Sequence, residues 1–108
     1  MNDHQLLCFL TVSRTLNFTT AARELYCTQP ALSYQIRSLE KKLDLTLFER
    51  STTRVALTEA GRAFVPQAEA IYRSILNART ALKGFARRHT LTLRLPPVLL
   101  QRDPIYPI

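Results

Sequence analysis

Glycine, cysteine and tryptophan are scarce in this sequence of 108 residues, with two, two and none respectively. Two glycines are too few for the glycine-rich loop that cradles phosphates in many nucleotide-binding proteins. Cys8 and Cys27 form no Cys-x-x-Cys unit, and only two histidines accompany them, so a zinc site is not expected. We therefore expect no metal and no cofactor. Both cysteines are expected to be reduced, as in a cytoplasmic protein.

Long apolar runs and catalytic constellations are missing as well. No apolar run approaches the roughly 20 residues of a membrane span, and the amino terminus has neither a basic start nor a cleavage site. Paired carboxylates in a plausible cleft and a Ser/His/Asp set are also lacking. We therefore predict that the chain is not an enzyme, crosses no membrane and has no signal peptide.

The charge balance is strongly positive. Lys and Arg number 15 against 8 Asp and Glu, which gives a net charge of +7, and 46% of the residues are hydrophobic. The hydrophobic content is sufficient for the core of one small domain. The positive excess favours a polyanionic partner.

The first half of the chain predicts three helices. A helix over residues 3 to 15 can be capped by Asn2 or Asp3, and a short second helix by Asn17 or Thr19. The three residues Tyr26 to Thr28 then form a turn into a longer helix that ends at Leu43. Two helices joined by such a turn form a helix-turn-helix.

The third helix has two contrasting faces. Thr28 is a good N-cap, and Leu32, Ile36, Leu39 and Leu43 recur at helical spacing on one face. The other face and the first turn are polar and basic, which suits the DNA major groove, although an ordinary amphipathic surface helix would look similar. The residues of this helix that we predict to bind DNA are Thr28, Gln29, Pro30, Ala31, Ser33, Tyr34, Arg37, Ser38 and Lys41.

Two short strand-like runs follow, residues 47–49 and 55–57, with a polar and basic segment between them. They predict a hairpin, or wing, with two arginines at its tip. The arginines can meet phosphates or the adjacent minor groove, and the hydroxyls can add phosphate hydrogen bonds. A solvated hairpin turn is the alternative. The predicted DNA-binding residues of the wing are Arg50, Thr52, Thr53 and Arg54.

A long helix is predicted from residue 59 to about Arg88, with Thr58 as its cap. Its apolar residues recur at alternating steps of four and three, as in a coiled coil. We expect this seam to be covered by a second copy of the chain, although its first one or two turns could pack on the chain's own core. The predicted dimerisation residues are Phe64, Ala68, Ile71, Ile75, Ala78, Leu82 and Phe85.

The last 20 residues change character, because four of the six prolines lie among them. Residues 90–95 alternate in the manner of a strand. We expect residues 89–108 to be extended or flexible and to form the truncated start of a domain that this chain lacks.

An ordered set of residues over about 60 positions resembles the DNA-binding region and linker helix of LysR-type transcriptional regulators. The matching residues are Phe18, Ala21, Ala22, Leu25, Gln29 to Ser33, Gln35, Ile36, Leu39, Glu40, Leu47, Phe48, Arg50, Leu57, Thr58, Ala60 and Gly61.

The resemblance implies a mainly α fold, a winged helix-turn-helix of three helices and a two-stranded wing over residues 1–58, followed by a dimerising linker helix over residues 59–88. It implies that Gln29, Pro30, Ser33 and residue 34 face double-stranded DNA and that Arg54 lies near the minor groove. Full members of the family carry an effector domain that senses a small molecule. Because we expect this chain to lack that domain, we expect no small-molecule ligand for it.

Three positions depart from the family pattern. Asp44 stands where the family usually has a glycine after the third helix, and Leu16 and Asn17 replace a usual Gly-Ser pair. Tyr34 stands where arginine is common, so a bidentate contact to guanine is not expected there, and a tyrosine can instead hydrogen-bond a phosphate or contact a thymine methyl group.

The sequence therefore predicts a sequence-specific, homodimeric DNA-binding module of a bacterial transcription regulator, located in the cytoplasm at the nucleoid. The alternative is an interaction protein that dimerises with full-length relatives and modulates them. Full-length family members and RNA polymerase are the further candidate partners.

Overall fold

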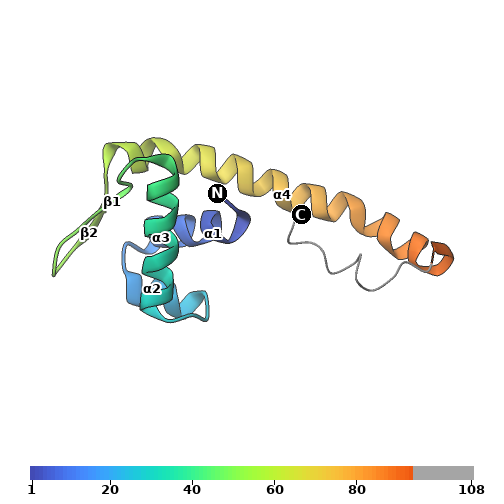
Figure 1. The fold of residues 1–108 in the computed structure, drawn as a ribbon, viewed down its shortest axis with the longest axis horizontal. Coiled ribbons are helices and arrows are strands. Elements are labelled where there is room, and N and C mark those ends of the chain that lie inside the picture. The colour runs from blue at the N-terminus through green and yellow to red at the C-terminus, as the bar shows by residue number, and fades with distance from the viewer. Residues whose placement is uncertain (94–108) are drawn as a thin grey trace. The chain divides into compact units, whose positions relative to one another are not determined.

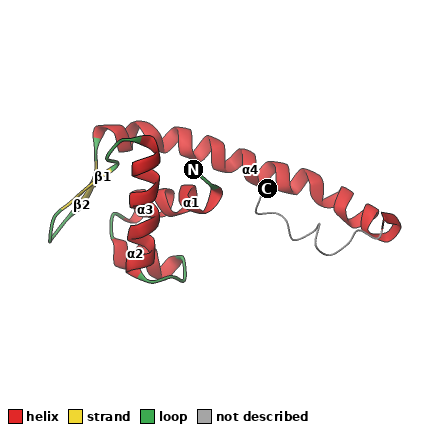
Figure 2. Ribbon diagram, in the orientation of Figure 1, coloured by secondary structure: helices red, strands yellow, loops and turns green. Residues whose placement is uncertain are grey.

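The computed structural model describes the backbone of residues 1–93 and the side chains of residues 1–85. The fold is mainly α, as predicted, with one two-stranded antiparallel sheet (Figure 1, Figure 2). The elements are α1 (Asp3–Thr15), α2 (Phe18–Glu24), α3 (Gln29–Leu43), β1 (Phe48–Arg50), β2 (Val55–Leu57) and α4 (Glu59–Leu93).

Side-chain caps fix the starts of the first three helices. The side-chain oxygen of Asn2 accepts from the Gln5 amide at 2.8 Å, and that of Asn17 from the Thr20 amide at 2.8 Å. The hydroxyl of Thr28 accepts from the Ala31 amide at 3.2 Å. Of the caps that the sequence left open, the structure therefore selects Asn2 and Asn17, and the predicted cap of the third helix is confirmed.

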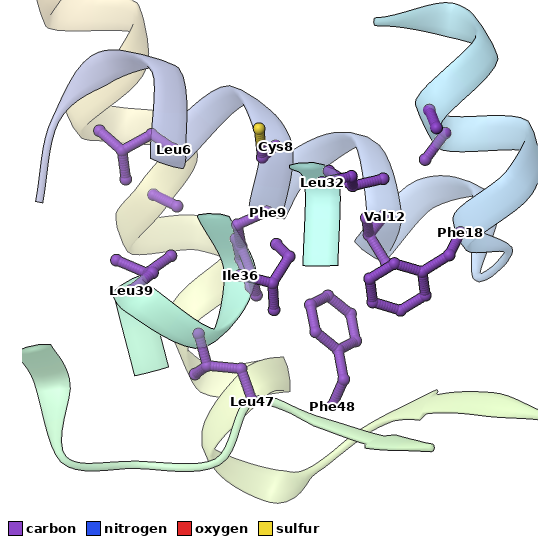
Figure 3. Packing of buried hydrophobic residues seen from close by; sticks show 13 residues of the cluster. Leu6, Cys8, Phe9, Val12, Phe18, Leu32, Ile36, Leu39, Leu47 and Phe48 are labelled. Carbon is purple, nitrogen blue, oxygen red and sulfur yellow. The ribbon is translucent and has the colours of Figure 1, made fainter. Parts of the chain in front are cut away.

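Aromatic rings hold the core of the compact unit Met1–Ile75 together. The ring of Phe9 lies 5.5 Å from that of Phe48 and 4.9 Å from that of Phe64, measured between centroids. Figure 3 shows Phe9 and Phe48 beside the apolar residues of α3, and Phe18 beyond them. Each of these contacts joins segments far apart in the sequence, so the core binds the helices and the hairpin to one another.

The predicted apolar face of α3 is confirmed, because Leu32, Ile36 and Leu39 are completely buried. At the other end of this helix, Asp44 adopts φ 56° and ψ 42°, the left-handed conformation that glycine adopts most readily. The Asp44 amide donates to the Lys41 carbonyl at 3.2 Å and the Leu45 amide to the Glu40 carbonyl at 3.1 Å. This pair of bonds is a Schellman motif.

The start of α4 packs closely on the segment before β1. The hydroxyl of Thr58 accepts from the Gly61 amide at 2.9 Å, which confirms the predicted cap, and donates to the Thr46 carbonyl at 2.6 Å. A Cβ atom on Gly61 would overlap the carbonyl oxygen of Leu47 and lie 2.9 Å from Leu57 Cδ2. Only glycine therefore allows this approach of helix to backbone.

Two expected element boundaries are wrong. The first strand begins at Phe48, one residue later than expected, and ends at Arg50. The long helix continues past Arg88 to Leu93, so residues 90–93 are helical and not a strand. A lone strand leaves its backbone groups unpaired, whereas a helix pairs them internally. The rest of the expected strand and tail lies outside the described residues.

Three predicted dimerisation residues contact the chain's own core. Ala68 is completely buried, Phe64 packs on Phe9, and Ile75 is partly buried against the core. The first turns of α4 therefore pack on the chain's own core, which is the alternative that the sequence left open for them. Ile71 and Leu82 are exposed by 38% and 59% respectively. The other two predicted seam residues, Ala78 and Phe85, are exposed as well.

The two glycines give a matched test of this packing. We expect Gly61→Ala to lower the free energy of unfolding by roughly 3 kcal/mol, because backbone atoms of Leu47 cannot move aside as a side chain can. Gly84→Ala has nothing within 4 Å of its new Cβ and should favour the helix by roughly 0.5–1 kcal/mol. Urea denaturation followed by circular dichroism measures both changes. Equal midpoints for the two variants would contradict the close approach at Gly61.

Asp44 provides a second stability test. We expect Asp44→Gly to raise the free energy of unfolding by about 1 kcal/mol, since glycine adopts the left-handed conformation without strain. Asp44→Asn keeps the shape of the side chain and removes its negative charge from the negative end of α3, and asparagine also tolerates the left-handed conformation. Thermal melts of the three proteins compare these effects. A glycine variant no more stable than the asparagine variant would show that the backbone conformation is unstrained.

Candidate nucleic-acid interface

The outer face of α3 is open to solvent. Tyr34 is 68% exposed, and Gln29, Pro30, Arg37 and Lys41 are exposed as well. Four further residues of this helix and its N-cap were predicted to bind DNA. Of these, Thr28 and Ala31 are exposed, and Ser33 and Ser38 are half-buried. The second half of this face is hollowed where Tyr34, Arg37, Ser38 and Lys41 meet.

The wing and the first half of α3 line one groove. Its volume is about 430 Å³. Its lining combines amide and hydroxyl groups with two guanidinium groups and brings together residues from α3, the start of α2 and the hairpin. The lining residues are Leu16, Asn17, Phe18, Gln29, Ser33, Arg50, Ser51, Thr52, Thr53, Arg54 and Val55.

The tip of the wing is a tight turn held by Ser51. Its amide donates to the Arg54 carbonyl at 2.9 Å, and its hydroxyl accepts from the Arg54 amide at 3.1 Å. Thr52, Thr53 and Arg54 are exposed around this turn. Their hydroxyl and guanidinium groups can therefore meet a ligand without rearrangement of the backbone.

Arg50 does not lie at the tip, which corrects the expected wing. It is the last residue of β1, and its side chain is only 24% exposed. Its guanidinium carbon lies 4.5 Å from the centre of the Phe18 ring, and its Nη2 atom lies 3.8 Å from Glu40 Oε1. Burial lowers the pKa of Arg50, and the nearby Glu40 carboxylate opposes that shift. An arginine still stays charged at neutral pH.

Two side chains that the sequence analysis did not select orient this interface. The hydroxyl of Thr19 donates to Gln29 Oε1 at 3.3 Å, which leaves the Gln29 amide nitrogen to donate outward. The carboxylate of Glu40 accepts from the Leu47 and Phe48 amides at 2.7 and 3.2 Å. The sequence does contain a signal for Glu40, because it is the single carboxylate of an otherwise basic helix and lies beside the core face. For Thr19 the sequence gives no comparable signal.

The half-buried Ser38 is tied to α1. Its hydroxyl accepts from Gln5 Nε2 at 3.1 Å, and Gln5 is almost fully buried. Ser38 therefore also fixes the distance between α1 and α3.

The cysteines are free, and Cys8 is completely buried. Burial, with a smaller contribution from Cys27, raises the pKa of the Cys8 thiol to about 11, so the thiol stays neutral and unreactive at physiological pH.

Within residues 1–85, no three His, Cys, Asp or Glu side chains are placed to hold a metal ion. No helix in the described part of the chain is long and apolar enough to cross a membrane.

Comparison with known families gives one match over more than half of the chain. Residues 4–62 match the model described as "Bacterial regulatory helix-turn-helix protein, lysR family". The matched range includes the whole helix-turn-helix, the wing and the start of α4.

Individual relatives agree with this match. The chain is 38% identical over 93 residues to the HTH-type transcriptional regulator HdfR of Salmonella newport (strain SL254), which covers 86% of this chain and 34% of that protein. The chain thus spans about a third of the length of the curated relatives that it matches.

Solved structures bound to DNA are also similar. The BenM DBD in its complex with catB site 1 DNA is 32% identical, with a TM-score of 0.73, and the match covers 80% of this chain and 97% of that one. Full-length CbnR in its complex with target DNA is 35% identical, with a TM-score of 0.70, and the match covers 80% of this chain and 29% of that one.

Proposed function

The chain belongs to the LysR family of bacterial helix-turn-helix regulatory proteins and carries their DNA-binding domain, and we propose that it reads double-stranded DNA with α3 in the major groove and the wing beside it. The observation that carries this proposal is the shared groove. It places Gln29 and Ser33 of α3 next to Arg54 of the wing, so one ligand can contact all three.

Base reading is assigned to the first turns of α3. Gln29 presents an amide donor, because Thr19 engages its oxygen, and base edges in the major groove carry acceptors at guanine N7 and O6, adenine N7 and thymine O4. Ser33 lies one turn further along and can donate or accept. The exposed ring of Tyr34 supplies a thymine-methyl contact or a hydroxyl for phosphate.

The wing and the rest of α3 are assigned to the DNA backbone. Arg54 meets a phosphate or the minor groove, and Thr52 and Thr53 add hydroxyl contacts. Arg37 and Lys41 are exposed and cationic, so they suit phosphates flanking the major groove. These contacts give affinity and register, while the start of α3 gives specificity.

A homodimer through α4 completes the proposal. Ile71, Ala78 and Leu82 lie at coiled-coil spacing and are exposed in the single chain. Covering them with a second copy would bury apolar surface and hold two DNA-binding domains as a pair. The same surface would serve the alternative function, dimerisation with full-length relatives.

The DNA contacts can be separated by their dependence on sequence and salt. We expect Gln29→Ala to weaken binding to DNA enriched from a random pool by about tenfold while leaving unselected DNA nearly unaffected. Arg54→Gln should weaken both and reduce the slope of log K against log salt by about 0.9, the value for one phosphate. Fluorescence anisotropy at several salt concentrations measures these quantities.

Arg73→Gln, which removes an exposed charge from α4, is the control. Equal losses on both DNAs from Gln29→Ala would count against base reading.

The dimer can be tested at residues that do not belong to the core. We expect Ile71→Asp combined with Leu82→Asp to give monomers, because two like charges would face each other across the seam. Sedimentation equilibrium measures the mass, and the same protein should bind a two-site operator weakly. Thr80→Asp places one charge on the opposite side of α4 and should leave the dimer intact. An unchanged mass for the double variant would refute the seam.

A further inference from the structure

We propose that Arg50 and Glu40 form a clamp that positions the wing relative to α3, and that Arg50 supports DNA binding through this position without being a phosphate ligand. The proposal rests on the DNA-binding function proposed above and assigns to Arg50 a role different from the one expected from the sequence. Arg54 is left as the phosphate-binding arginine of the wing.

The first half of the clamp is the carboxylate of Glu40. Both amides that it accepts, those of Leu47 and Phe48, belong to the point where the chain enters β1. Because Glu40 is part of α3, these two bonds determine where the first strand of the wing begins relative to that helix. The carboxylate is mostly buried, with 16% of the side chain exposed, so water competes little for the bonds.

The second half of the clamp is the guanidinium of Arg50. It lies at the far end of β1, over the ring of Phe18 at the start of α2 and near Oε1 of Glu40. One oxygen of Glu40 therefore faces the start of β1 and the other faces its end. The strand is held at both ends by one side chain of α3, and Phe18 supports the guanidinium from the second helix.

The surroundings of Arg50 fit a structural cation better than a phosphate ligand. Its Nη2 atom is buried, and the guanidinium carbon lies 4.5 Å from the centre of the Phe18 ring. A phosphate would have to draw the guanidinium away from the ring and the carboxylate, which costs the interactions that hold β1. Arg54 lies exposed at the tip of the same hairpin and can meet a phosphate without such a cost.

Charge-preserving and charge-removing variants distinguish the two roles. We expect Arg50→Gln and Arg50→Lys each to weaken binding to enriched DNA by about tenfold, because lysine keeps the charge but not the planar group that stacks on Phe18. The salt slope should stay at the wild-type value for both, whereas Arg54→Gln should lower it by about 0.9. Glu40→Gln should lower the affinity for enriched DNA about as much as Arg50→Gln does. The double variant should bind this DNA no more weakly than whichever single variant binds it more weakly.

A measurement without DNA tests the clamp by itself. We expect Arg50→Gln to speed the hydrogen exchange of the Leu47 and Phe48 amides by at least about tenfold, because the carboxylate loses its partner and its orientation. Arg54→Gln should leave both amides unchanged. Thermal melts show whether each variant is folded, and if Arg50→Gln is unfolded, Arg50→Lys takes its place in the exchange experiment.

The outcomes separate the clamp from the proposed function. Wild-type affinity for Arg50→Lys together with a slope reduced by 0.9 for Arg50→Gln would make Arg50 a phosphate ligand and overturn the clamp. Unchanged exchange of the Leu47 and Phe48 amides in the folded Arg50 variant would overturn it as well. A wild-type protein with no preference for enriched DNA would instead refute sequence-specific binding, and the exchange data would still decide on the clamp.

Discussion

The backbone of Leu47 is held from both sides, and the arrangement of α3, the wing and α4 depends on it. Its amide donates to Glu40 of α3, and its carbonyl accepts from the Thr58 amide at the start of α4 at 2.9 Å. The side chain is completely buried, and Gly61 leaves room for the close approach of α4. A buried backbone group without a partner is costly, so these bonds leave little freedom to the residues that follow.

This constraint explains how so short a hairpin can hold a fixed position within the proposed binding surface. Two strands of three residues each are only marginally stable by themselves. Here Phe48 is packed against Phe9 in the core, and Glu40 fixes the strand that carries it. The tip around Arg54 thus projects from a fixed base, and recognition does not have to order it first. Preorganisation of this kind lowers the entropic cost of binding.

Local signals in the sequence predicted most of the elements, and contacts between distant segments account for the position of Arg50, which the sequence did not predict. Caps such as Asn17 and Thr28 and the apolar spacing of α3 depend on neighbouring residues, so the sequence contains them directly. The position of Arg50 depends on Phe18 and Glu40, which only the folded chain brings beside it. Periodicity likewise cannot tell whether an apolar residue of a helix meets its own core or a partner, and the contact of Phe64 with Phe9 becomes visible only in the folded chain.

The division of α4 into a buried beginning and an exposed continuation connects the two proposed activities. Its first turns cannot leave the core without uncovering Phe9 and Ala68, so this end of the helix is fixed to the DNA-binding domain. Further along this helix of 35 residues, the described part of the chain leaves apolar surface of Ile71 and Leu82 exposed. A second copy that covers this surface would therefore act on the DNA-binding domains through one continuous helix. In a pair held in this way, the spacing of two half-sites becomes a property of the dimer, and binding to both sites strengthens the affinity beyond that of either domain alone.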